Sequence, residues 1–513
     1  MFRSFASSLI SFVAILLFAF VFLFLWSGSE GIQFKRVAME GDRSTAQILE
    51  EYRRKNMARY EPSEDTGPAV EAPKENRGDG PPVVIWVSVP GFRGDYIEKA
   101  ETPFFDKLAE AGGSTNKMRP SFPCLTFPAH ATMATGVTPD KHGIVADRIR
   151  VAAGEVIVEP TDQSLLQAEP IWTTATRQGI KTLVHDWPLS QEQPVENAAA
   201  AFLESFDPEA GDTQRLDKAL EAWRKASGGA APAEETASAD DEAATEGEDA
   251  ADSPAVDDSE SAPEAAAEDD KVRLVMLRLT DILKAGLVNG PRADETYAAV
   301  TATDAALQAF FDTVQAEWES LAPANANLVM FVTTDHGMAE VDKNVNIEHL
   351  LGEEMTANAD IVAHDAIANL YFKDLPESEG EKKIFLDKFD GELSKRIYFR
   401  TLKKEELPAD WSYEHERTGD RVLVLKTSYA FADERSDEPV FDPADGPGFF
   451  GGYGYPVEES IRMSGQILLS GFPNSPATGS LGEIGQPSFH ATVCKILGIE
   501  PAEGASTETL GIE

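Results

Sequence analysis

Residues 83–91 have the sequence Val-Val-Ile-Trp-Val-Ser-Val-Pro-Gly, a continuous apolar run that ends at Pro90-Gly91. Such runs are typical of strands in a parallel sheet, because helices bury both faces of the sheet. A helical stretch covers Asp294–Glu319. Further strand candidates are Leu274–Leu279, Asn327–Thr333, Arg421–Leu425 and Gln466–Leu469. Strands that alternate with helices predict an α/β fold with a doubly wound, mostly parallel sheet flanked by helices, in which ligands bind at the carboxyl ends of the strands.

The size and charge of the chain exclude several classes of protein. Its 513 residues give room for roughly two to four domains, or for one large domain with an insertion. A net charge of −43 excludes nucleic-acid binding, because phosphate binding needs clustered Lys and Arg. The two cysteines, Cys124 and Cys494, are too few for a disulfide framework or a four-thiolate zinc site.

The N-terminal segment is apolar enough to span a membrane. No charged residue occurs between Phe5 and Trp26, and roughly 20 apolar residues cross the ~30 Å hydrocarbon layer as a helix. The run is longer than the apolar core of a signal peptide, about 7–15 residues, although Ser27-Gly28-Ser29 leaves cleavage as an alternative. We therefore expect residues 1–29 to be a single-pass transmembrane anchor and residues 30–80, rich in charge and proline, to be a polar tether.

Composition also separates an internal segment from the folded parts. Residues 228–270 contain sixteen Asp and Glu but no Lys, Arg, Leu, Ile or aromatic residue. Such a segment cannot bury enough apolar surface to offset its ordering entropy, so we predict a disordered acidic insert. It has two alternative roles, as a solvating insert or as a site for calcium or a basic partner. The insert divides the folded part into residues 81–227 and residues 271–513.

Three segments contain the residues of a candidate site. Residues 87–96 read Val-Ser-Val-Pro-Gly-Phe-Arg-Gly-Asp-Tyr, residues 120–130 read Pro-Ser-Phe-Pro-Cys-Leu-Thr-Phe-Pro-Ala-His, and residues 333–338 read Thr-Thr-Asp-His-Gly-Met. In this order and spacing they resemble the nucleotide pyrophosphatase/phosphodiesterase (type I phosphodiesterase) family of the alkaline phosphatase superfamily. The likeness covers about residues 83–500 and implies an alkaline-phosphatase-like fold. Because the resemblance is to exported domains, we expect the folded part on the periplasmic or extracellular side of the membrane.

The resemblance implies a two-metal active site with a threonine nucleophile. A threonine hydroxyl is a poor nucleophile near neutral pH and needs a metal that favours its alkoxide, and a second metal stabilises the leaving oxygen. The nucleophile position is Thr126. Asp335 and His336 occupy the positions of the Asp-His pair that binds the metal nearest the nucleophile. The implied cofactor is zinc or another divalent metal, held by His and carboxylate side chains.

Four of the six implied metal ligands are replaced, so at most one metal site is expected. Leu and Pro cannot coordinate a metal, and a Tyr phenolate is an unusual zinc ligand. A Gly-Pro pair fixes the register of the second segment independently of its ligands, and Asp281 is the only carboxylate near it. The replaced positions are Pro90, Leu283, Leu287 and Tyr453.

These substitutions favour a membrane-anchored, catalytically degenerate protein that binds a phosphorylated small molecule or an envelope protein partner. The alternative is an active metal-dependent hydrolase of phosphodiester or pyrophosphate bonds with Thr126 as the nucleophile. A third interpretation is a purely structural scaffold, which is favoured if side chains fill the cleft.

Each candidate residue also has a structural interpretation. Thr126 is a suitable helix N-cap, because Pro128 follows near the first helical positions. Asp335 and His336 can persist as a hydrogen-bonded pair at the end of a strand. We expect His130 and His142 to be structural rather than ligating. Asp186, beside a Trp-Pro pair, is the one further carboxylate expected near the cleft.

Overall fold

The structure is a computed structural model that describes residues 78–151, 154–195, 198–203, 206–228, 271–432, 438–444 and 448–512. The predicted anchor, residues 30–77 of the predicted tether and residues 229–270 of the predicted acidic insert lie outside this part. Within the described residues, no helix is both long enough and apolar enough to cross a membrane.

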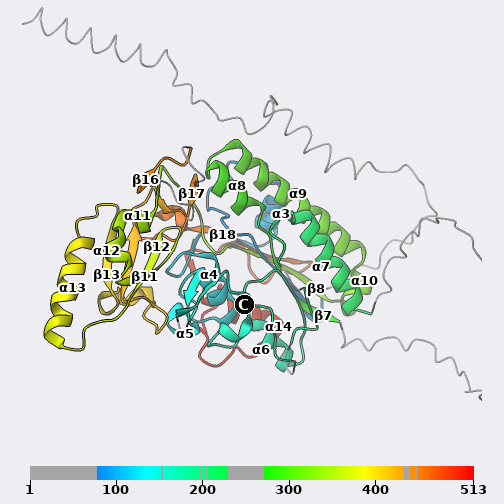
Figure 1. Cartoon of the computed structure of the whole chain (residues 1–513). Helices are drawn as coiled ribbons and strands as arrows, with labels where there is room; N and C mark the ends of the chain where they lie inside the picture. The colour runs from blue at the N-terminus through cyan, green and yellow to red at the C-terminus, as the bar shows by residue number, and fades with distance from the viewer. Residues whose placement is uncertain are drawn as a thin grey trace, which may run out of the picture. The chain divides into compact units, whose positions relative to one another are not determined.

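A nine-stranded sheet forms the centre of the fold (Figure 1). β1 (Pro82–Ser88) pairs in parallel with β7 (Val272–Arg278) on one side and with β8 (Asn327–Thr333) on the other. β5 (Lys181–His185) pairs in parallel with β7, and β6 (Ala201–Leu203) pairs in parallel with β5. The carboxyl ends of these strands therefore meet at one edge of the sheet, as the apolar runs predict.

The far edge of the sheet is partly antiparallel. β18 (Gly465–Phe472) runs antiparallel to both β8 and β2 (Gly113–Arg119). Two short strands, β19 (Gly479–Ser480) and β20 (Ile484–Gly485), pair in parallel with β2. The prediction of a mostly parallel sheet in an α/β fold is confirmed.

Helices cover both faces of this sheet (Figure 1), and β1 supplies side chains to both layers. Val83, Ile85 and Val87 pack into one apolar cluster, whereas Val84 and Trp86 pack into another, because successive side chains of a strand point to opposite faces. On the first face lie α3 (Pro103–Ala111), α7 (Asp212–Ala226), α8 (Asp281–Asn289), α9 (Asp294–Ala316) and α10 (Trp318–Leu321). On the second face lie α4 (Thr126–Thr135), α6 (Ile171–Arg177) and α14 (Ser488–Leu497).

A smaller antiparallel sheet lies beside the main one, together with α13 (Glu379–Leu393). Its strand order is β11 (Ala359–His364), β12 (Ile367–Phe372), β14 (Arg421–Leu425) and β13 (Phe399–Lys403). Assignment of Arg421–Leu425 to the doubly wound sheet was therefore wrong. All five residues of β14 are buried, and a buried apolar run does not specify which sheet it joins.

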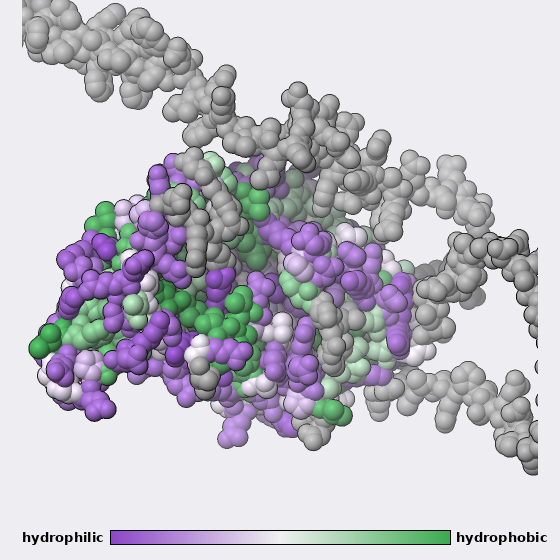
Figure 2. Space-filling model, in the orientation of Figure 1, coloured by the Kyte–Doolittle hydropathy of each residue, from purple (hydrophilic) through white to green (hydrophobic). Residues whose placement is uncertain are grey.

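In the view of Figure 2, hydrophilic side chains cover most of the described surface, with smaller hydrophobic patches between them.

Short elements complete the described part of the fold. The remaining helices and strands are α5 (Pro139–His142), β3 (Arg148–Arg150), β4 (Val156–Val158), β9 (Ala339–Glu340), β10 (Lys343–Val345), α11 (Ile347–Leu351), α12 (Glu353–Thr356), β15 (Tyr429–Phe431), β16 (Val440–Phe441) and β17 (Gly451–Gly452).

Candidate functional site

Thr126 is the first residue of α4 and not its cap. The N-cap position is held by Leu125, which has an extended backbone and makes no side-chain capping bond. The Thr126 hydroxyl oxygen lies 3.2 Å from His336 Nε2, and the Thr126 side chain is 2% exposed. The helix-cap interpretation of Thr126 was therefore wrong, and its hydroxyl lies beside the His336 ring.

Asp335 and His336 follow the end of β8 after one intervening residue, Thr334, and are fully buried. Asp335 Oδ1 accepts hydrogen bonds from the backbone N–H groups of Gly91 (3.1 Å) and His336 (2.7 Å). His336 Nδ1 lies 2.7 Å from the Gly337 carbonyl oxygen, so this nitrogen is the protonated one and Nε2 faces Thr126. The structure thus brings the three predicted site residues together; their chemical roles stay predictions.

Apolar and aromatic side chains occupy two of the positions where the resemblance implies metal ligands. The Tyr453 ring stacks on the His336 ring, with centroids 4.1 Å apart and planes at 14°. Leu283 is 7% exposed, and a Cβ added at Gly91 would lie 3.5 Å from Leu283 Cα and 3.4 Å from Met338 Cε. Side chains at these positions are therefore in ordinary van der Waals contact with their neighbours.

This arrangement agrees with the comparison to known families. Residues 84–455 match the family model described as type I phosphodiesterase/nucleotide pyrophosphatase. The chain belongs to this family. The match includes the segments of Thr126, Asp335 and His336.

Individual relatives in the phosphodiesterase family match shorter segments. An uncharacterized pyrophosphatase/phosphodiesterase of Schizosaccharomyces pombe is 34% identical over 149 residues, which are 27% of this chain and 30% of the relative. Ectonucleotide pyrophosphatase/phosphodiesterase family member 3 of Bos taurus is 34% identical over 117 residues, 21% of this chain and 13% of that protein. The matched segments thus span less than a third of either relative.

Solved structures of the family share the fold. Murine ectonucleotide pyrophosphatase/phosphodiesterase 5, an inactive variant in complex with AMP, aligns with a TM-score of 0.62 at 20% identity and covers 83% of this chain and 97% of its own. The human protein of the same name aligns with a TM-score of 0.59 at 18% identity, over 82% and 95% of the two chains. These likenesses support the alkaline-phosphatase-like fold.

Members of this family are generally dependent on divalent metals, but the residues that the structure describes at the implied ligand positions do not fit a two-metal centre. Among the residues that the structure describes, no group of three or more His, Cys, Asp or Glu side chains is placed to hold a metal ion. Burial raises the pKa of Tyr453 well above its ordinary value, so its phenol stays neutral and is a poor substitute for a histidine ligand.

Residues predicted to be structural have structural partners. His130 Nε2 lies 2.8 Å from Ser88 Oγ, and its Nδ1 lies 2.7 Å from the Thr126 carbonyl oxygen. His142 Nε2 lies 3.0 Å from Thr132 Oγ1. Burial lowers the pKa of His130 to about 4, so its ring is neutral at physiological pH.

The two further carboxylates considered from the sequence are bound elsewhere. Asp186 is ion-paired with Arg215, and both side chains are buried. Asp281 Oδ2 accepts a hydrogen bond from the backbone N–H of Asp212 at the start of α7, 3.0 Å away. Asp281 therefore stabilises a helix end, and its capping bond argues against a replacement metal ligand.

An ion pair beside Thr126 was not predicted from the sequence. Asp147 Oδ1 accepts a 2.7 Å hydrogen bond from the Phe127 backbone N–H, and Asp147 Oδ2 lies 3.3 Å from His364 Nε2 and 3.4 Å from the Tyr453 hydroxyl. Burial acts to raise the pKa of Asp147, but His364 and the Phe127 N–H outweigh it, and the pKa is lowered. Asp147 lies outside the three segments that contain the candidate site residues, so nothing in the sequence identified its partner.

Arg278, the last residue of β7, was also not predicted to belong to the site. The signal was available, because a single arginine interrupts the otherwise apolar run Leu274–Leu279 next to its carboxyl end. Ser88 of β1 is its neighbour across the sheet. The positive charge of Arg278 therefore lies at the same edge of the sheet as the site residues.

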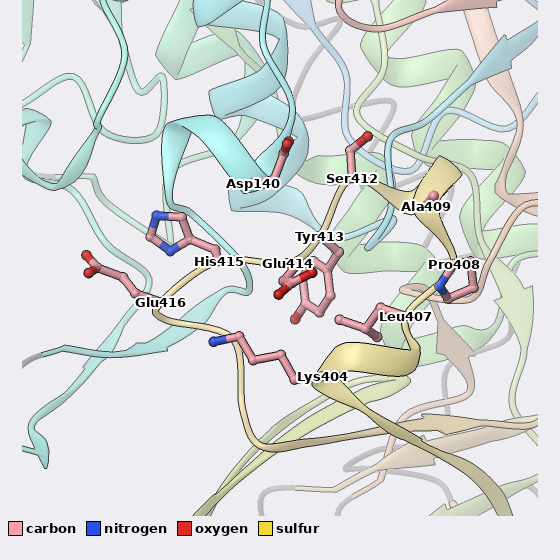
Figure 3. A pocket seen from close by; sticks show the side chains of 10 residues that line it. All are labelled: Asp140, Lys404, Leu407, Pro408, Ala409, Ser412, Tyr413, Glu414, His415 and Glu416. Atoms are coloured by element: carbon pink, nitrogen blue, oxygen red, sulfur yellow. The ribbon is translucent and has the colours of Figure 1, made fainter.

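An open pocket of about 580 Å³ lies elsewhere, between α5 and the segment that follows β13 (Figure 3). None of the three predicted site residues lines it, so it is distinct from the candidate site. Its lining residues are Asp140, Lys404, Leu407, Pro408, Ala409, Ser412, Tyr413, Glu414, His415 and Glu416.

Proposed function

We propose that this chain is a catalytically degenerate member of the phosphodiesterase family that binds a phosphorylated ligand or a protein partner without turning it over. The replacement of metal ligands carries the proposal: Leu283 packs beside Gly91 and the Tyr453 ring stacks on His336. Loss of one metal of a pair removes several kcal/mol of transition-state stabilisation, which corresponds to several orders of magnitude in rate at about 1.4 kcal/mol per tenfold.

Metal content and turnover test this proposal together. The full-length chain, purified with zinc present, is expected to hold at most one zinc by elemental mass spectrometry. Turnover of a chromogenic phosphodiester is expected to stay at background and to be the same for Thr126→Ala. About two zinc ions per chain, together with turnover that Thr126→Ala abolishes, would instead establish the metal-dependent hydrolase.

AMP is the natural probe for the ligand, because the murine type 5 structure is described as a complex with AMP. Calorimetric titration with AMP is expected to show binding. Absence of binding would contradict a nucleotide monophosphate as the ligand, whereas turnover is measured separately with the chromogenic phosphodiester.

A protein partner is the second candidate ligand. Thr126, Asp335 and His336 are at most 2% exposed. A site that is closed in this way supports a partner that recognises the outer surface of the domain. This candidate includes a role of the chain as a scaffold in an envelope complex. A chain that binds no AMP, but whose cross-linked complexes contain a defined envelope protein, would favour this candidate.

We further propose that residues 1–29 anchor the chain in a membrane, with the folded domain on the periplasmic or extracellular side. The length of the apolar segment Leu9–Trp26 supports this proposal. The full chain is expected to stay with the membrane pellet after carbonate extraction, and the chain without residues 1–29 is expected to be released. Release of the full chain would contradict the anchor.

A further inference from the structure

Arg278 is a buried arginine for which no residue in the described part of the chain provides a hydrogen-bond or ion-pair partner. Its side chain is 7% exposed, and its guanidinium carbon lies 5.9 Å from the Phe127 ring centroid and 4.9 Å from that of Phe206. Its Nε is buried without a hydrogen-bond acceptor, and no described residue forms an ion pair with it. A buried guanidinium is strongly unfavourable unless opposite charge lies nearby.

The strongest source of opposite charge for Arg278 is Asp335. β7 and β8 flank β1, so their carboxyl ends place Arg278 and Asp335 on either side of Ser88. Asp335 Oδ2 is buried and has no hydrogen-bond partner among the described residues. Burial lowers the pKa of Arg278, and the charge of Asp335 is the strongest electrostatic contribution that opposes this effect.

Two histidine rings also lie near Asp335. His336 Nε2 lies 3.3 Å and His130 Nδ1 lies 3.8 Å from Asp335 Oδ2. In each ring Nδ1 lies 2.7 Å from a backbone carbonyl oxygen and Nε2 lies 2.8–3.2 Å from a hydroxyl oxygen, so a neutral ring satisfies both contacts. A guanidinium, in contrast, stays protonated and is weakly hydrated, which suits it to a buried position between aromatic rings.

We propose that the guanidinium of Arg278 replaces the positive charge of the metal ions at this site, balances Asp335 and keeps the site folded with no metal bound. The inference goes beyond the proposed function, because it concerns the site whether or not a ligand binds. It explains how a buried carboxylate persists after most of the implied metal ligands have been replaced.

A double-mutant cycle on the full-length chain tests this charge balance. Arg278→Met leaves the negative charge of Asp335 unbalanced, and Asp335→Asn leaves the positive charge of Arg278 unbalanced. The double variant has neither charge. We expect each single change to lower the folding equilibrium constant. The folding equilibrium constant of the double variant should be at least tenfold higher than the value predicted by adding the two single effects on the free energy of folding. Additive effects would overturn the proposal.

Arg224 and Glu317 provide the matched control, because they form an ion pair at the surface. In the same cycle on Arg224→Met and Glu317→Gln, the folding equilibrium constant of the double variant is expected to lie within about fivefold of the additive value. A coupling at Arg278 and Asp335 no larger than this surface value would also overturn the proposal.

Chelation gives an independent test on the unaltered chain. The melting temperature is expected to be the same with EDTA and with added zinc, because no metal supports the site. A melting temperature that falls in EDTA and is restored by zinc would overturn the proposal, even if Arg278→Met fails to fold.

Arg278→Lys, which keeps the charge, is expected to be more stable than Arg278→Met. AMP binding is measured separately, so its absence would contradict only the proposed ligand.

Discussion

A chain that carries Pro90→Asp, Leu283→Asp, Leu287→His and Tyr453→His is expected to bind about two zinc ions, whereas the natural chain is expected to bind at most one. The four changes add two carboxylates and two imidazoles to Asp335 and His336, and these are the ligand types that zinc prefers. Without metal the variant should be less stable than the natural chain, because Leu283 is buried against Gly91. Zinc at about 100 times its dissociation constant should return about 2.7 kcal/mol.

Elemental mass spectrometry and thermal unfolding with and without zinc measure both effects. The matched control carries Asn or Gln at the same four positions, which gives similar polarity without carboxylate or imidazole ligands, and it should gain no zinc. Adding Arg278→Met to the four changes should strengthen zinc binding by removing a nearby positive charge. A folded quadruple variant that binds no more zinc than the natural chain would show that these four positions are not the metal-ligand positions.

Asp147→Ala is expected to lower the free energy of unfolding by about 3–5 kcal/mol. The change removes the partner of His364 and leaves the Phe127 backbone N–H without its acceptor, and both groups lie beside the start of α4. Chemical denaturation with two probes measures the loss. Asp147→Asn should cost less, because its side-chain oxygen can still accept from Phe127.

The pH dependence of this pair has two limits. The pKa of Asp147 lies below its ordinary value of 3.8, so the stability that ionised Asp147 contributes is lost as pH falls through its folded-state pKa. Burial acts to lower the pKa of His364, but Asp147 raises it above its ordinary 6.5. The stability that protonated His364 contributes is therefore lost as pH rises through its folded-state pKa. The difference between the natural chain and Asp147→Ala should therefore be largest between pH 3.8 and pH 6.5.

Asp360→Ala is the control, because it removes a partly exposed carboxylate that forms ion pairs with Arg150 and Lys373. It should cost less than about 1 kcal/mol. A loss of the same small size for Asp147→Ala would contradict the importance given to the buried pair.

The fold was predictable where the chain is buried on both faces. Apolar runs identified β1, β7 and β8 because helices pack against both sides of these strands. The same signal placed β14 in the wrong sheet, since burial specifies neither the partner nor the direction of a strand. The antiparallel direction of β18 was equally invisible, because it depends on the path of the chain between distant elements.

The site was predictable only where its residues lie in recognisable motifs. Thr126, Asp335 and His336 were found in this way, and the structure brings them together. His364 comes from the second sheet, and its pairing with Asp147 depends on how that sheet packs beside the first. Arg278 could have been noticed as a charge in an apolar run, but its electrostatic partner follows from the order of β7, β1 and β8.

The packing of Leu283 beside Gly91 and Met338 also bears on the evolutionary history of the chain. A lone Asp at position 283 would place a charge among apolar side chains before the other ligands existed to hold its metal. The cost of several kcal/mol for such a group is a large part of the total stability of about 5–15 kcal/mol that a domain has. A lineage that returned to metal chemistry by single substitutions would therefore pass through poorly folded ancestors. Selection for folding alone would keep the site closed, long after the pressure that first removed its ligands had gone.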